Sequence, residues 1–206
     1  MSELFSIQLQ NRQQQGRDGV WLDLPTTTEQ VQAALRQIGI SSDNPQGLFI
    51  SGYFAEEKKR FAIPYNMVLA SNVDELNFLA SRLETLSAGE RAELNAALQA
   101  PQSELFSIGR ITDFPENVDY YVHLPDVRGP AQLGDYYLNR SGMVDMPEEW
   151  KGGIDTAQFG RYVAQQEQGA FTQYGYLVKS GDEWQKVYEG PVSYTHLRAH
   201  ETLSDL

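Results

Sequence analysis

The sequence contains no cysteine in its 206 residues and only three histidines. Without cysteine the chain can form neither disulfides nor thiolate metal sites. Disulfides are typical of secreted proteins and rare in the cytosol, so their exclusion here favours a cytoplasmic protein.

Long apolar runs are missing as well. No stretch of about 18 apolar residues occurs, so no segment has the length of a transmembrane helix. The opening stretch MSELFSIQLQNRQQQ carries an acid early and lacks a continuous apolar core, which argues against a secretory signal. The sequence therefore predicts a cytoplasmic protein of one large or two to three small domains, with no membrane-spanning part.

Basic residues are few relative to acidic ones. The chain has 16 Lys and Arg against 28 Asp and Glu, which gives a formal net charge of −12. Residues 1–100 contain 12 acids and 8 bases, and residues 101–190 contain 14 acids and 7 bases. Such a balance repels nucleic acid and favours partners that are basic or that normally hold DNA. The plainer interpretation is a solvated acidic surface without a special role.

Capping pairs followed by apolar residues at helical spacing predict helices in both halves of the chain. The first predicted helix ends at Gly39, residues 71–101 are predicted to form a helical hairpin, and two weaker helices begin near residues 130 and 155. The capping pairs that carry this interpretation are Thr26–Glu29, Asn72–Glu75, Ser87–Glu90 and Asp155–Gln158.

Alternating apolar segments predict strands on either side of the helical hairpin, so the predicted fold class is α+β. Three segments follow from this order: a mixed β/α part at 1–70, a central helical part at 71–101 and an acidic α+β part at 102–190. The predicted strands are 4–9, 19–25 and 47–54 in the first part, and 104–111, 119–125, 170–179 and 183–189 in the last.

Conventional catalytic motifs are also missing. The sequence has no phosphate-binding glycine loop, no Gly-x-Ser-x-Gly elbow and no zinc-ligand spacing. His123 lies in a strand pattern, which is typical of a structural histidine. The adjacent acids Glu56–Glu57 and Glu148–Glu149 point apart on a strand or around a helix, which suits a surface better than acid/base catalysis. We therefore expect neither an enzyme nor a cofactor, and a hydrolase with paired carboxylates is the weakest alternative.

Four stretches resemble the ArdA-type antirestriction proteins of conjugative elements and plasmids. They follow the order of that family: a strand–turn–strand–helix opening, an Asp-Glu-Leu-Asn-x-Leu-Ala helix start, a Leu-Gly-x-Tyr-Tyr helix before an acidic segment, and an Asp-x-x-x-Tyr-Gly-Arg helix before a final strand. Phe159 stands where the family usually has the tyrosine. The stretches are FSIQLQNRQQQGRDGVWLDLPTTTEQVQAALRQIGI, VDELNFLASRLETLS, LGDYYLNRSGMVDMPEEW and IDTAQFGRYVAQQEQGAFTQYGYLV, and together they cover most of residues 4–190.

The resemblance implies an elongated, three-part acidic homodimer that imitates the charge of bent B-form DNA. Proteins of this type occupy the DNA-binding groove of type I restriction–modification enzymes, where carboxylates stand in for the phosphates that duplex DNA carries at about one per 1.7 Å. We expect such an enzyme, or another DNA-binding defence protein, as the partner, with no nucleic acid, cofactor or metal bound. The predicted mimic acids are Asp113, Glu116, Asp119, Asp126, Asp135, Asp145, Glu148, Glu149 and Asp155.

One region departs from the family pattern. Residues 40–70 are especially acidic in the family, whereas Lys58, Lys59 and Arg60 lie there in this chain. The second half is therefore expected to carry more of the charge mimicry. The alternative is an acidic adaptor that binds a basic protein without imitating DNA. An adaptor needs only an acidic patch, whereas a mimic needs a continuous stripe of acids at near-phosphate spacing.

The end of the chain holds the other two histidines. His196 and His200 are four residues apart, so on a helix they would share one face as paired metal ligands do, with Glu201 beside them. However, the peptide VSYTHLRAHET at 192–202 resembles one reading frame of a transposase-based sequencing-library adapter, and the family resemblance stops just before it. We therefore predict that residues 191–206 are a non-native tail, that the authentic C-terminus is missing, and that these histidines form no site.

Deleting residues 192–206 is expected to leave the melting temperature and the activity unchanged, because a foreign tail makes no evolved contacts. Thermal unfolding of the full and shortened chains, each with and without Zn²⁺, measures this. A melting temperature that drops by several degrees on deletion, or a full-length chain clearly stabilised by Zn²⁺, would contradict the prediction.

Overall fold

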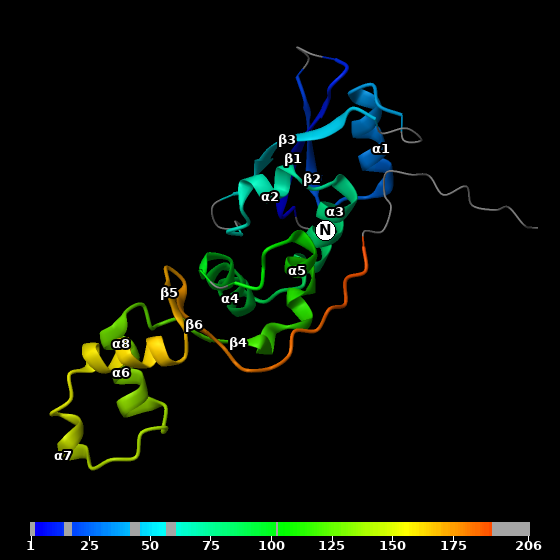
Figure 1. Ribbon diagram of the computed structural model, residues 1–206. Helices are drawn as coiled ribbons and strands as arrows, with labels where there is room; N and C mark the ends of the chain where they lie inside the picture. Colours follow the sequence, from blue (N-terminus) through cyan, green and yellow to red (C-terminus); the bar gives the residue numbers. More distant parts are fainter. Residues whose placement is uncertain (1–2, 15–17, 42–45, 57–60, 102, 191–206) are drawn as a thin grey trace, which may run out of the picture. The chain divides into compact units, whose positions relative to one another are not determined.

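The computed structural model describes residues 3–14, 18–41, 46–56, 61–101 and 103–190, and its mixture of helices and antiparallel strands confirms the α+β fold class (Figure 1). The described residues divide into two compact units. The first comprises residues up to 85 together with 107–112 and 188–190, and the second comprises 86–106 and 113–187. These bounds differ from the three predicted segments 1–70, 71–101 and 102–190, which stay a prediction.

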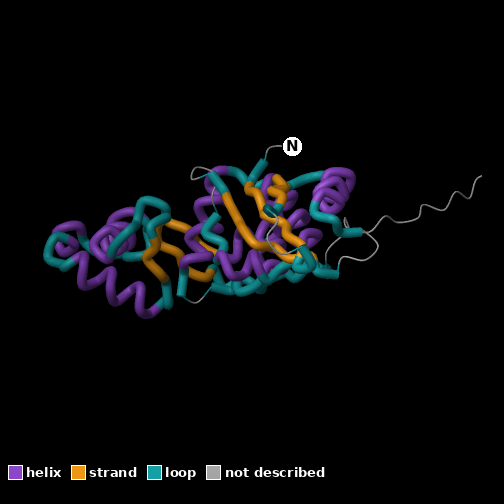
Figure 2. Tube along the Cα trace, turned by 90° about the horizontal axis from the view of Figure 1, so that it is seen from above, coloured by secondary structure: helices purple, strands orange, loops and turns teal. Residues whose placement is uncertain are grey.

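The first unit contains a three-stranded antiparallel sheet with the order β2-β1-β3, part of the orange trace in Figure 2. Its strands are β1 (Phe5–Asn11), β2 (Val20–Leu24) and β3 (Leu48–Phe54). The register places Ile7 opposite both Leu22 and Tyr53, so apolar side chains gather on one face of the sheet. The strand residues buried in the core are Phe5, Ile7, Leu9, Leu22, Leu24 and Ile50.

Three helices pack on this sheet. Helices α1 (Thr28–Gln37) and α3 (Val73–Glu84) contact β2, and α2 (Tyr65–Leu69) contacts β3. The buried Asn77 side chain of α3 accepts a hydrogen bond from the Thr26 N–H at 2.7 Å and donates one to the Thr26 carbonyl at 3.0 Å. These two bonds hold Thr26, just before the start of α1, against α3. The asparagine of the Asp-Glu-Leu-Asn stretch therefore has a structural role.

The helix starts follow the predicted caps, with one correction. The side chains of Asn72 and Ser87 accept hydrogen bonds from the third backbone N–H of α3 and of α4 (Ala88–Gln99), as predicted. The prediction of Thr26 as the cap of α1 is wrong by one residue, because Thr27 forms the capping box with Gln30. Asn77 already occupies the backbone groups of Thr26, so the helix begins one residue later.

The prediction of a strand at 104–111 is wrong, because Ile108–Asp113 form helix α5. The Ser107 hydroxyl accepts a hydrogen bond from the Arg110 N–H at 3.3 Å and so starts the helix as a cap would. Leu105, Ile108 and Ile111 are buried at intervals of three residues, which is helical spacing. Two 3₁₀ turns follow α5, η2 (Phe114–Glu116) and η3 (Val118–Tyr120).

The second unit has its own three-stranded antiparallel sheet, with the order β4-β6-β5. Strand β4 (Tyr121–Leu124) pairs with β6 (Gly175–Lys179), and β5 (Ala170–Thr172) forms a hairpin with β6. The predicted strands at 119–125 and 170–179 are confirmed, the latter as this hairpin. Helix α4 packs against β4 and β6.

The prediction of a strand at 183–189 is also wrong. The backbone of this segment is bonded to side chains instead of to a neighbouring strand. The Asn117 side chain accepts a hydrogen bond from the Gln185 N–H at 2.7 Å and donates one to the Gln185 carbonyl at 2.9 Å. The Val187 N–H donates to the Asp113 carboxylate at 3.1 Å. Two buried polar side chains thus satisfy the backbone that a sheet would otherwise satisfy.

Helices α6 (Pro130–Asp135) and α8 (Thr156–Gln166) lie side by side in the second unit (Figure 1). Gly134 of α6 lies against the Thr156 carbonyl, and Gly160 of α8 lies against the Pro130 carbonyl. Neither glycine has room for a Cβ atom, so the two backbones approach more closely than any larger residue permits. Helix α6 continues into a π-helical turn, η4 (Tyr136–Arg140), and the one-turn helix α7 (Glu148–Lys151) lies on the long connection to α8.

Replacing Gly160 with Ala is expected to destabilise the protein by about 2 kcal/mol or more, because the new methyl group would collide with the Pro130 carbonyl. Chemical denaturation followed by circular dichroism measures the free energy of unfolding. Gly89→Ala in α4 is the matched control, since a Cβ there meets nothing within 4 Å, and it should leave stability unchanged or raise it by up to about 1 kcal/mol. Equal stability of the two variants would contradict the close α6–α8 contact.

Candidate partner-binding surface

Eight of the nine predicted mimic acids lie on the surface of the second unit. Glu116 and Asp119 belong to η2 and η3, Asp126 follows β4, and Asp135 ends α6. The remaining four lie between η4 and α8. Seven of the eight are exposed and Asp135 is partly covered. The eight surface acids are Glu116, Asp119, Asp126, Asp135, Asp145, Glu148, Glu149 and Asp155.

Asp113 is the exception. Its exposed fraction is 3%, and its carboxylate accepts the Val187 N–H within the second unit. A carboxylate in this position cannot face a partner without losing that bond, so Asp113 holds the 183–187 segment in place. The sequence signal that could have separated it from the other acids is its position between the apolar residues Ile111 and Phe114, both fully buried.

Three of the surface acids also have structural contacts. Asp135 pairs with Arg140 at 3.1 Å, and Glu148 pairs with Lys151 at 2.6 Å. The Asp155 carboxylate accepts the Gln158 N–H at 2.9 Å and so caps α8, as the sequence predicts. These contacts orient the carboxylates, and the two ion pairs offset part of their charge.

Sequence reasoning missed a carboxylate with a different role. Glu167, which ends α8, accepts hydrogen bonds from the Tyr137 hydroxyl at 2.8 Å and from the Tyr176 hydroxyl at 2.6 Å. Burial and the Glu167 carboxylate raise the pKa of both tyrosines above its ordinary value. Tyr137 is in η4 and Tyr176 is in β6, so Glu167 links the helices to the sheet. Its carboxylate is used by these two hydrogen bonds within the unit.

The second unit also has a hollow of about 240 Å³ beside Glu167, between the end of α4 and strand β6. Its charged lining groups are already paired. Glu167 holds the two tyrosines, and the Lys179 ammonium bonds the Glu104 carboxylate at 2.7 Å. The other walls are mainly apolar or small, such as Ala100, Pro101 and Leu177. The hollow therefore offers no convergent catalytic groups.

The histidines do not add a metal centre among the residues that the structure describes. His123 donates a hydrogen bond from Nε2 to the Tyr174 carbonyl at 2.9 Å, which is a structural contact in the sheet. Within the described ranges, no three His, Asp or Glu side chains converge as metal ligands would. His196, His200 and Glu201 lie outside the described residues, as does the Lys58–Arg60 run.

Comparison with known families places these features in context. The model of the family described as "Antirestriction protein (ArdA)" matches residues 15–178, which include all eight surface acids and both helix-contact glycines. The chain belongs to the ArdA antirestriction family. No curated protein matches the chain. None of the helices in the described part is both long and apolar enough to cross a membrane.

Two of the ArdA-like stretches owe part of their pattern to the α6–α8 contact. The glycine of Leu-Gly-x-Tyr-Tyr is Gly134, and the glycine of the Phe-Gly-Arg sequence in α8 is Gly160. The second tyrosine of the first stretch is Tyr137, which bonds Glu167. These three ArdA-like positions therefore have structural roles in the second unit, which carries the surface acids.

One acid of the second unit is uncharged near neutral pH. Burial, followed by the charges of Glu90 and Asp119, raises the pKa of Glu93 in α4 to about 8. One of its carboxyl oxygens is buried without a hydrogen-bond partner. An uncharged, partly covered side chain contributes little to the negative field that a partner meets.

Glu93 should make the stability of the protein depend on pH. In the unfolded chain its pKa lies near 4.5, so the native state holds a proton that the unfolded state loses. The resulting stabilisation is complete below about pH 4.5 and is lost as the pH rises to about 8. Glu93→Gln is therefore expected to raise stability by on the order of 1 kcal/mol at pH 8.5, after allowance for partial exposure, and to flatten the pH profile.

Denaturation of wild type and Glu93→Gln between pH 5 and pH 9 measures this difference. Glu149→Gln, at an exposed position, is the matched control, and its stability should change with pH as that of wild type does. A difference between Glu93→Gln and wild type that stays constant with pH would contradict a raised pKa.

Proposed function

We propose that this ArdA-family protein is a homodimeric DNA mimic that occupies the DNA-binding groove of a type I restriction–modification enzyme in the cytoplasm, and that it catalyses no reaction. The eight surface carboxylates take the place of phosphates against the Lys and Arg side chains of that groove. Because such contacts read no bases, inhibition is insensitive to the target sequence of the enzyme.

The observation that carries this proposal is the excess of exposed acids in the second unit. Its residues include 15 acids and 7 bases, and nine of these acids are exposed against five of the bases. Three of those bases, Arg140, Lys151 and Lys179, are held by carboxylates of the same unit. The free Lys and Arg side chains that would repel a basic groove are therefore fewer still.

The second half is proposed to dominate the interaction. Residues 1–100 have 12 acids and 8 bases, and the ArdA-like acidic region at 40–70 includes three consecutive bases in this chain. A partner that attracts carboxylates gains less from this half. An acidic adaptor would also use the second half, but it would need a few acids at one patch and would lose activity when one or two of them are changed.

Inhibition is expected to depend on many acids at once. The test set is Asp119, Asp126, Asp145 and Glu149, which are all exposed. Changing any one to its amide should weaken inhibition only a few-fold, because a screened surface contact contributes at most about 1 kcal/mol. Changing all four should remove several kcal/mol and should flatten the dependence of affinity on salt. Competition with DNA for a purified type I enzyme, at two salt concentrations, measures both effects.

The matched control exchanges Asp and Glu at the same four positions, which keeps the charge while moving each carboxylate by one methylene group. This variant should retain most of the inhibition if charge matters more than exact position. Loss of all inhibition from one amide substitution in a folded protein would favour the adaptor over the mimic.

A further inference from the structure

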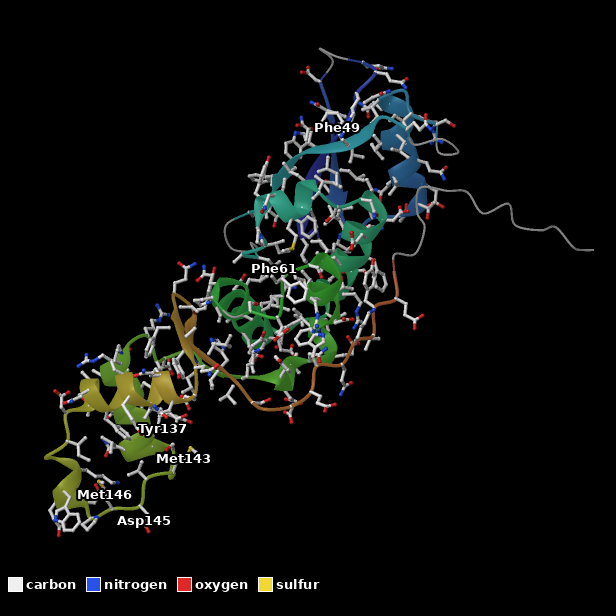
Figure 3. The ribbon with its side chains drawn as sticks, viewed as in Figure 1. Phe49, Phe61, Tyr137, Met143, Asp145 and Met146 are labelled. Carbon is white, nitrogen blue, oxygen red and sulfur yellow. The ribbon has the colours of Figure 1, made fainter. Side chains whose placement is uncertain are left out.

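The connection between η4 and α8 forms a distinct acidic arm, defined here as residues 143–155. It leaves the α6–α8 pair, passes through α7 and returns to α8 (Figure 1). Met143, Asp145 and Met146 lie along its first, extended part (Figure 3). The arm has four acids and one base, and the base is Lys151.

Lys151, the single base of the arm, is mostly covered and already paired. The Lys151 side chain is 15% exposed and bonds Glu148, whose side chain is 81% exposed. Asp145 and Glu149 are exposed on the arm and have no basic residue of the arm left to pair with. The arm therefore presents negative charge to its surroundings, which suits a basic surface.

Trp150 lies among the acids of the arm, and most of its side chain is exposed to solvent. Its exposed fraction is 67%, although an indole ring gains more than most side chains from burial. The two residues after Lys151 are glycines, so they add no side chain that could cover the ring, and a Cβ at Gly152 would meet nothing within 4 Å.

We propose that Trp150, within the negative field of the acidic arm, receives an arginine from the DNA-binding groove of the restriction enzyme. The inference rests on the proposed function and adds a contact that phosphate mimicry does not contain. A guanidinium group can stack on an indole face, and tryptophan gives the strongest such cation–π contact. A groove that binds DNA supplies arginine for phosphate contacts.

This contact gives the complex a component that salt screens only weakly. Contacts between carboxylates and the groove weaken as salt rises, because ions compete for both partners. Burial of an aromatic ring against a guanidinium plane depends much less on ionic strength. Tryptophan and arginine are also the residues that most often carry the binding energy of protein interfaces.

The experiment measures inhibition of a type I restriction enzyme by the full chain across a salt series. Trp150→Ala is expected to weaken inhibition at least about tenfold at every salt concentration and to leave the salt slope unchanged. Trp150→Phe should retain most of the affinity, and Trp150→Leu should lose most of it, since leucine keeps the apolar bulk without an aromatic face. Trp21→Ala is the matched control, because Trp21 is 50% exposed on β2 in the first unit, and it should inhibit as wild type does.

The possible failures are distinguishable. If wild type does not inhibit, the proposed function fails and this inference fails with it. If wild type inhibits and Trp150→Ala matches Trp21→Ala, only the arginine contact is overturned. Light scattering is run on each variant, and a change of mass in Trp150→Ala would instead place Trp150 between two copies of the chain. Equal inhibition by the leucine and phenylalanine variants would overturn the stacking contact.

Discussion

The second unit depends on one steric constraint, the close approach of α6 and α8. Gly134 and Gly160 each lie against the backbone carbonyl of the first residue of the opposite helix, so no side chain separates the two backbones. This contact fixes both ends of the acidic arm, because η4 continues α6 and Asp155 caps α8. Packing of Val127, Leu133 and Tyr176 beneath the helices joins the pair to the sheet. Two residues without charge thus hold the ends of the arm that carries four of the surface acids.

Burial and hydrogen bonding divide the acids of this unit into two groups. Asp113 and Glu167 serve the interior, where they accept hydrogen bonds from the Val187 backbone and from two tyrosine hydroxyls. Glu93 is uncharged near neutral pH because it is partly buried beside other acids. A partner therefore meets fewer carboxylates than the composition suggests. The same residue type stabilises the fold at one position and faces solvent at another, and the difference lies entirely in what surrounds it.

Features that depend on neighbouring residues could be predicted from the sequence. The caps at Asn72, Ser87 and Asp155 involve residues three positions apart, and each is present in the structure. Features decided by distant residues could not. Thr26 does not cap α1 because Asn77, 51 positions away, holds its backbone. The 183–189 segment is no strand because Asn117 and Asp113 bind it across 68 and 74 positions. The family resemblance supplied the candidate acids as a set, but the burial of Asp113 follows only from the fold.

Charge and apolar contact place different requirements on a protein that competes with DNA. A distributed array of carboxylates draws a basic groove from a distance and tolerates imprecise positions, but salt screens it and each contact is weak. An exposed aromatic ring acts only at contact and requires a defined position. Different parts of the fold meet these two requirements. A cap and two ion pairs orient three of the surface acids, whereas the arm that bears Trp150 begins and ends on the α6–α8 pair, whose close contact leaves no room for a side chain. The rigid contact thus supports the part of the surface on which position matters most.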